Sequence, residues 1–108
     1  MKKPNGKAVR GSSSGKPTMV LLDVLGTKWT LRILWELVDC TFNFRDLRNQ
    51  CDNISPTILN NRLKELRVLK LVTHNENGYS LTSRGSELIS YLLPLHAWAE
   101  EWSKEVNS

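Results

Sequence analysis

The segment from Ser55 onward predicts a helix with two different faces. Its apolar stripe is Leu59, Leu63 and Leu66, and its polar face carries Thr57, Asn60, Asn61 and Lys64. An asparagine amide can bond adenine at two atoms, and a lysine can reach guanine or a phosphate. A helix that enters the major groove of DNA needs this apolar back and polar front. An ordinary amphipathic surface helix would show the same residue types on its solvent-exposed face. Other signals must therefore distinguish a DNA-binding helix from an ordinary surface helix.

Candidate phosphate contacts surround the polar face. Ser55 as N-cap with Pro56 at the first helical position marks a helix start, where backbone N–H groups attract phosphate. Arg62 and Arg67 flank the face. Arg48 and Arg45 precede it and could bind phosphates, although solvated surface explains Arg45 equally well. The candidate DNA-binding residues are Arg45, Ser55, Pro56, Thr57, Asn60, Asn61, Arg62, Lys64, His74 and Asn77.

Apolar spacing predicts the elements that position these residues. Four helices are expected, over residues 18–25 with Thr18 as N-cap, 27–38, 44–51 with Asn43 as N-cap, and 55–69. Gly26 separates the first two helices, and the turn of residues 52–54 separates the last two. A short helix, a tight turn and a second helix with a polar face are typical of a helix-turn-helix.

A hairpin and a last helix follow. Residues 71–74 and 79–81 alternate like strands, and the intervening Asn-Gly is a strong hairpin signal. Thr82 then caps a helical region from Ser83 to about Val106, which Pro94 should kink or split. The elements therefore predict a fold that is mainly α with a small β-hairpin, arranged as a winged helix-turn-helix. Because the wing tip carries Glu76 and no cation, we expect the wing to touch DNA only lightly.

Charge is unevenly distributed along the 108 residues, whose formal net charge is +4. Residues 1–18 carry five basic residues and no acid, residues 42–70 have a net charge of +3, and residues 83–108 have −2. This asymmetry favours a polyanion near the centre of the chain. Residues 1–17 are rich in Gly, Ser and Pro, so we expect a disordered basic tail. Residues 18–108 are expected to form one winged-helix domain.

Other function classes find little support. The composition is ordinary for a soluble protein, with no apolar run long enough for a bilayer and no signal peptide pattern, so we expect a cytoplasmic protein without a membrane partner. No nucleophile triad, glycine-rich phosphate loop or carboxylate pair stands out, so we expect neither enzymatic activity nor a cofactor. Cys40, Cys51, His74 and His96 lack metal-ligand spacing, and Cys51 is expected to be buried.

Several motifs together resemble the HxlR family of bacterial and archaeal transcription regulators. They are Leu25-Gly26-Thr27-Lys28-Trp29-Thr30-Leu31-Arg32-Ile33-Leu34, Phe44-Arg45-Asp46-Leu47, Ile54-Ser55-Pro56, Asn61-Arg62-Leu63-Lys64-Glu65-Leu66 and Tyr79-Ser80-Leu81-Thr82 with Gly85 and Trp98. The resemblance covers about residues 20–102. It implies a MarR-like winged-helix homodimer that binds a pseudo-palindromic operator in double-stranded DNA, most often as a repressor. It also implies that the first and last helices build the dimer.

The apolar stripe of the last helix agrees with that implication. This stripe is large for a helix at a chain end. A body of about 90 residues has only a small core, so we do not expect it to cover the whole stripe. A two-fold interface would cover it with the same patch of a second copy. The candidate dimerisation residues are Met19, Leu22, Leu88, Leu92, Leu95, Trp98 and Trp102. Trp29 and Trp35 are expected in the core, with an unidentified small-molecule effector near the dimer junction as a further option.

Two departures from the family pattern leave alternatives open. Members usually carry a cysteine near the start of the first helix, where this chain has Met19 and Val20, and the wing is shorter and less basic than usual. One alternative is a winged-helix module that binds proteins rather than DNA. The other is a redox sensor that acts through Cys40 or Cys51. The sequence identifies neither the operator nor the effector.

Overall fold

The computed structural model describes residues 16–108, so nearly all of the predicted basic tail lies outside the described residues. Helix α1 covers Pro17–Leu25, which makes the predicted N-cap at Thr18 wrong by two residues. Lys16 is the N-cap, and its side chain makes no capping hydrogen bond. Pro17 lies in the first turn, where its fixed φ suits a helix and its missing N–H costs nothing, so the helix begins before Thr18.

Helix α2 is shorter than predicted and covers Thr30–Glu36 rather than 27–38. Trp29 has a left-handed φ of 80°, which interrupts regular helix before Thr30. Thr27 closes the end of α1, because its hydroxyl donates to the carbonyl of Asp23 and its N–H donates to the carbonyl of Val24, both at 3.1 Å. The half-buried Trp29 side chain packs against the core, and this tertiary contact outweighs local helix propensity.

The two helices around the central turn follow the prediction closely. Helix α3 covers Phe44–Gln50, and the side chain of its N-cap, Asn43, accepts a hydrogen bond from Asp46 N at 2.7 Å. Helix α4 covers Pro56–Val68 with Ser55 as N-cap. Lys70 has a left-handed φ of 63°, which allows Leu71 N to bond the Leu66 carbonyl at 3.0 Å. This arrangement satisfies the last carbonyls of α4 and ends the helix.

The first strand of the hairpin begins and ends one residue later than predicted. Strand β1 covers Val72–Asn75 and strand β2 covers Gly78–Leu81, paired antiparallel with Val72 opposite Leu81. Leu71 is excluded from the strand because its N–H closes α4. Phe42 adds a bridge that the sequence did not reveal, since it exchanges two backbone hydrogen bonds with Tyr79, at 2.7 and 3.1 Å. The wing is thereby tied to the residues that precede α3.

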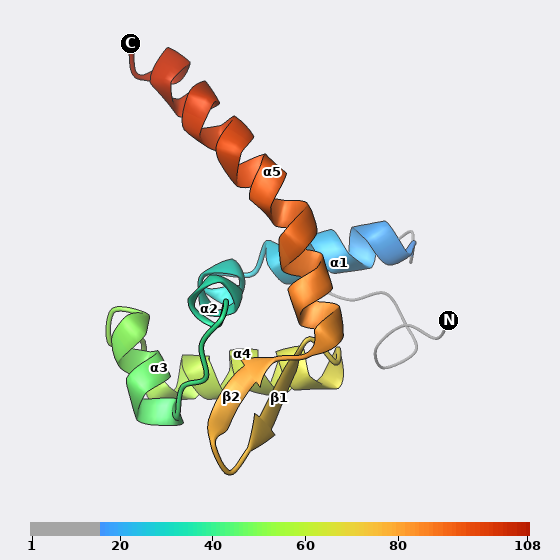
Figure 1. The fold of residues 1–108 in the computed structure, drawn as a ribbon, viewed down its shortest axis with the longest axis vertical. Coiled ribbons are helices and arrows are strands. Elements are labelled where there is room, and N and C mark those ends of the chain that lie inside the picture. The colour runs from blue at the N-terminus through green and yellow to red at the C-terminus, as the bar shows by residue number, and fades with distance from the viewer. Residues whose placement is uncertain (1–15) are drawn as a thin grey trace.

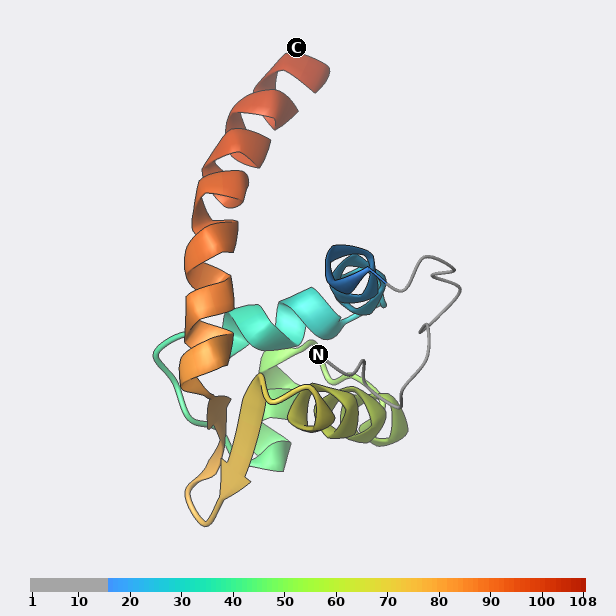
Figure 2. The ribbon, with the colours of Figure 1, turned by 90° about the vertical axis from the view of Figure 1, so that its right-hand side faces the viewer.

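Helix α5 covers Ser83–Val106 as one element, so the predicted split at Pro94 does not occur, although the helix curves along its length (Figure 2). Pro94 and Ser90, whose carbonyl loses its helical partner, are both exposed, so water can satisfy that carbonyl. Thr82 caps the helix as predicted and accepts from Gly85 N at 3.0 Å. No helix within residues 16–108 is both long and apolar enough to cross a membrane.

One core lies where α2, α3, α4, the hairpin and the start of α5 meet. Its fully buried side chains include Ile33, Leu34, Leu47, Leu59 and Leu63. In Figure 1 the hairpin lies at one end of the molecule, and the C-terminal half of α5 extends away from the body at the other end. The core thus holds α3, α4 and the wing together and leaves much of α5 uncovered.

Candidate nucleic-acid interface

Helix α4 has the two faces that its sequence predicts. Leu59, Leu63 and Leu66 are buried in the core. The predicted polar residues Thr57, Asn60, Asn61 and Lys64 are all exposed. The apolar stripe therefore fixes the helix against the body while a continuous row of hydrogen-bonding groups faces solvent. Such a face can donate to and accept from base edges without displacing any core contact.

The N-terminus of α4 is also exposed. The Ser55 hydroxyl accepts from Ile58 N at 3.4 Å, a long capping bond, and Pro56 stands in the first turn. Ser55, Pro56 and Thr57 are all exposed, so the N-terminal end of the helix macrodipole is open to a phosphate.

Two of the predicted cations already hold backbone carbonyls. Arg62 Nε donates to the Lys28 carbonyl at 3.1 Å, which ties α4 to the turn before α2. Arg48 Nε donates to the Ile54 carbonyl at 2.6 Å, immediately before the N-cap of α4. Arg45 and Arg67 are exposed on α3 and on the last turn of α4. Structural contacts thus occupy one nitrogen of Arg62 and one of Arg48, whereas Arg45 and Arg67 extend from the surface.

The wing presents few groups to a polyanion. The exposed His74 ring stacks on Tyr79 with centroids 3.9 Å apart and planes within 5°. Asn77 is exposed in the two-residue loop, and its N–H donates to the Asn75 side chain at 2.8 Å. Both predicted wing residues are therefore accessible, and Glu76 beside them supplies the only formal charge in the loop.

Sequence reasoning missed the contacts of Arg32. Its Nε donates to Glu36 at 2.8 Å, and its other nitrogens reach Asp52 at 3.1 Å and the Gln50 carbonyl at 2.7 Å. These hydrogen bonds, with Glu36 first and Asp52 second, raise the pKa of the guanidinium. The contacts to Gln50 and Asp52 join α2 to the end of α3 and to the turn between α3 and α4. Local pattern could have indicated only the contact with Glu36, which lies four residues away on the same helix.

The predicted dimerisation residues divide into two groups. Leu88 and Leu92 are half-buried and pack against the core of their own chain. The remaining five are exposed: Met19, Leu22, Leu95, Trp98 and Trp102. Tyr91, which the sequence did not single out, is 70% exposed beside them. The prediction that Trp35 belongs to the core is wrong, because its side chain is exposed and its ring lies 5.1 Å from that of His96 on α5.

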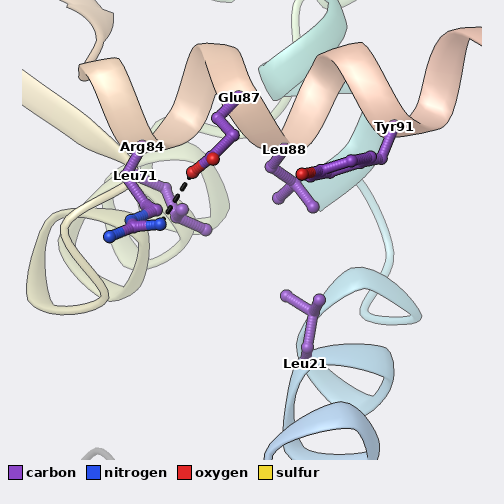
Figure 3. Close-up of a pocket in the computed structure, with 6 residues that line it drawn as sticks. All are labelled: Leu21, Leu71, Arg84, Glu87, Leu88 and Tyr91. Carbon is purple, nitrogen blue, oxygen red and sulfur yellow. Dashed lines mark hydrogen bonds and ion pairs between the residues drawn. The ribbon is translucent and has the colours of Figure 1, made fainter.

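A pocket of about 300 Å³ lies between α1 and the first half of α5. Leu21 of α1 faces Leu88 and Tyr91 of α5, and the paired side chains of Arg84 and Glu87 stand at one side, 2.7 Å apart (Figure 3). The lining is mainly apolar and continues into the exposed apolar residues of α5. This pocket is a recess in the same uncovered surface.

The two cysteines differ in environment. Cys51 is buried at the C-terminus of α3, as predicted, and Cys40 is exposed in the loop before Phe42. Burial raises the pKa of the Cys51 thiol from 9.0 to about 11, although the nearby Arg32 charge lowers it. Within residues 16–108, His, Cys, Asp and Glu side chains form no cluster of three that could hold a metal ion.

Two helices that pack on one core, the second with an exposed polar face, and an adjoining hairpin define a winged helix-turn-helix protein. The chain belongs to the HxlR-like helix-turn-helix family, whose model matches residues 24–107. This confirms the family to which the sequence motifs pointed. Proteins of this family are transcriptional regulators, a non-enzymatic class, that carry a DNA-binding helix-turn-helix.

Individual relatives agree with the family. The chain is 30% identical over 88 residues to YvaP of Bacillus subtilis, an uncharacterized HTH-type transcriptional regulator, with 75% of this chain and 82% of YvaP covered. It resembles quinone-bound YodB from B. subtilis, with a TM-score of 0.74 and 28% identity over 78% of this chain and 96% of YodB. A possible HxlR family transcriptional factor from Thermoplasma volcanium has a TM-score of 0.70 and 31% identity, covering 82% and 85% of the two chains.

Proposed function

We propose that the protein is a homodimeric, sequence-specific regulator that inserts α4 into the major groove of a pseudo-palindromic operator and represses transcription. The observation that carries this proposal is the exposed row of Thr57, Asn60, Asn61 and Lys64 on a helix whose opposite stripe is buried. Two copies of α4 would enter successive major grooves about 34 Å apart. Asn60 and Asn61 would read base edges, and Lys64 would reach guanine or phosphate.

The neighbouring groups suit phosphate binding. Exposed Arg45 and the N-terminus of α4 would hold the DNA backbone, and Arg62 would contribute the nitrogens that Lys28 does not use. His74 and Asn77 of the wing would add light contacts. The acidic Glu100, Glu101 and Glu105 lie on the half of α5 that points away from the wing, so they would not repel the polyanion (Figure 1).

The uncovered surface of α5 supports the homodimer. Helix α5 has 24 residues, and its exposed apolar side chains include Tyr91, Leu95, Trp98 and Trp102. Exposed apolar area of this extent on a small protein marks an interaction site. A second copy, packed through α1 and α5 about a two-fold axis, would cover this surface and the pocket beside Leu21. The same packing would bring the two α4 helices into one assembly.

The test is a binding titration. The protein is mixed with a duplex that it selects from a random pool and, separately, with a random-sequence duplex of the same length. We expect preference for the selected duplex, and affinity for both duplexes that falls steeply with rising salt as counterions are released. A promoter fused to that site should then be silenced by the protein. Absence of any salt-dependent binding would refute DNA recognition and favour the protein-binding alternative, which the cation-poor wing otherwise supports only weakly.

A further inference from the structure

On the basis of the proposed DNA-reading role of α4, we propose that Arg32 is a positioning residue for α4. Its guanidinium reaches from α2 to the last residue of α3, where it bonds the Gln50 carbonyl at 2.7 Å, and to the turn that leads into α4, where it bonds the Asp52 carboxylate at 3.1 Å. A third bond, to Glu36 at 2.8 Å, holds the same guanidinium to its own helix. Arg32 therefore connects α2 to the turn without being part of the exposed face of α4.

The turn needs such support because its backbone is unusual. Asp52 and Asn53 both have a left-handed φ of 57°, and neither is glycine. Each such residue costs about 1 kcal/mol or more, and persists where its surroundings hold it. Arg32 bonds Gln50, which immediately precedes the turn, and Asp52 within it, and Arg48 bonds the Ile54 carbonyl at the end of the turn at 2.6 Å. The next residue is Ser55, the N-cap of α4, so the turn sets where α4 begins.

The chemistry requires an arginine at position 32. A guanidinium presents donors in a planar fork that can serve three acceptors in different directions, whereas a lysine ammonium is a point charge on a flexible stem. The contact to Gln50 also places a cation at the C-terminus of α3, where the helix dipole is negative. The ion pair itself contributes little to stability, because the side chains of Arg32 and Asp52 are 39% and 70% exposed. Loss of this ion pair should therefore change the position of α4 and leave the free energy of unfolding nearly unchanged.

Two variants test this role through the ratio of affinities for the selected duplex and for the random-sequence duplex. Arg32→Gln should weaken binding to the selected duplex about tenfold, and leave the random duplex and the salt slope nearly unchanged. Asp52→Asn keeps a residue that tolerates left-handed backbone and removes only a negative charge. If only charge mattered, Asp52→Asn would tighten binding to both duplexes, because it removes a negative charge that repels DNA. Positioning predicts that it weakens binding to the selected duplex about threefold.

Matched controls separate position from charge and from folding. Glu36→Gln changes a group that contacts the same guanidinium but leaves the turn bonded, so specificity should stay as in the wild type. Asp39→Asn removes an equal charge from an exposed residue with a left-handed φ of 58°, away from the turn. A loss of stability alone would not change the affinity ratio at temperatures where every variant is folded, as circular dichroism would establish.

Three results would be decisive against the proposal. Equal losses on both duplexes, with a salt slope smaller by about one, would mean that Arg32 binds a phosphate directly. Wild-type specificity in both Arg32→Gln and Asp52→Asn would show that the contact between Arg32 and Asp52 does not position α4. Failure of the wild-type protein to select any duplex would instead refute the proposed function itself, and with it the role of Arg32.

Discussion

The indole rings of Trp98 and Trp102 stack one helical turn apart on α5, with centroids 5.9 Å apart and planes within 12°. The two residues are 61% and 52% exposed in the isolated chain. A stacked pair keeps both rings together as a single apolar surface, which is costly to leave in water.

Replacing Trp98 and Trp102 together by Ala should convert the proposed dimer into a monomer. Aromatic residues at the centre of an interface each contribute about 2 kcal/mol or more to association. Because a two-fold interface loses both indoles from each copy, the double replacement should raise the dimer dissociation constant by at least about a thousandfold. Sedimentation equilibrium measures the change. Val68→Ala, which removes an exposed apolar side chain from α4, is the control and should leave the dimer intact. A double variant that sediments as a dimer would place the interface elsewhere.

The polar face of α4 should determine sequence preference. Replacing Asn60, Asn61 and Lys64 by Ala should abolish the preference for the selected duplex, since each base contact contributes about 1–3 kcal/mol of discrimination. The fold should persist, because all three side chains are exposed. Fluorescence anisotropy with selected and random duplexes measures the ratio.

Arg45→Ala is the companion variant for that experiment. Removing a phosphate-binding cation from α3 should weaken binding to both duplexes alike and reduce the salt slope by about one. If the triple variant kept the full preference for the selected duplex, the proposal that α4 recognises base edges would be wrong. This would hold whatever the result for Arg45→Ala.

The two cysteines should differ sharply in reactivity. Exposed Cys40 should react with iodoacetamide in the native protein, whereas buried Cys51 should react only after unfolding, because the thiolate is the nucleophile and the pKa of Cys51 is raised to about 11. Mass spectrometry of peptides identifies the modified thiol. Rapid labelling of Cys51 in the folded protein at neutral pH would contradict the burial.

The same pKa shift predicts a pH dependence of stability. The folded state holds the Cys51 proton more tightly than the unfolded state, so this contribution is fully present below pH 9.0 and is lost as the pH rises toward about 11. Urea unfolding across that window should show a decrease that Cys51→Ala lacks. An identical decrease in the variant would assign the effect to other groups.

Gly85 should be intolerant of a side chain. A Cβ at this position would lie 2.1 Å from the carbonyl oxygen of Leu71, which is backbone and cannot rotate away. Gly85→Ala should therefore lower the free energy of unfolding by about 3 kcal/mol, despite the better helix propensity of alanine. Ser86→Ala, at the exposed next position of α5, should change stability by less than about 0.5 kcal/mol. Similar stabilities for the two variants in urea would contradict the close packing of α5 on Leu71.

The order of the elements could be read from the sequence because its signals are local. Asn43, Ser55 and Thr82 begin their helices through hydrogen bonds to N–H groups three residues away. The stripe of Leu59, Leu63 and Leu66 follows helical periodicity, so both the burial of α4 and the exposure of its polar face could be predicted. These interactions depend only on neighbours along the chain.

Tertiary structure alone decided features in which distant residues compete with local preference. The packing of Trp29 against the core shortened α2, and the bridge between Phe42 and Tyr79 tied the wing to α3. Arg32 meets Asp52 across 20 residues, and Arg62 meets Lys28 across 34, separations for which sequence carries no periodic signal. Spatial packing also exposed Trp35 while its helix neighbours Ile33 and Leu34 were buried. Contacts of this kind form only after the helices and strands have packed together. They therefore depend on the structure of the whole core and not on neighbouring residues along the chain.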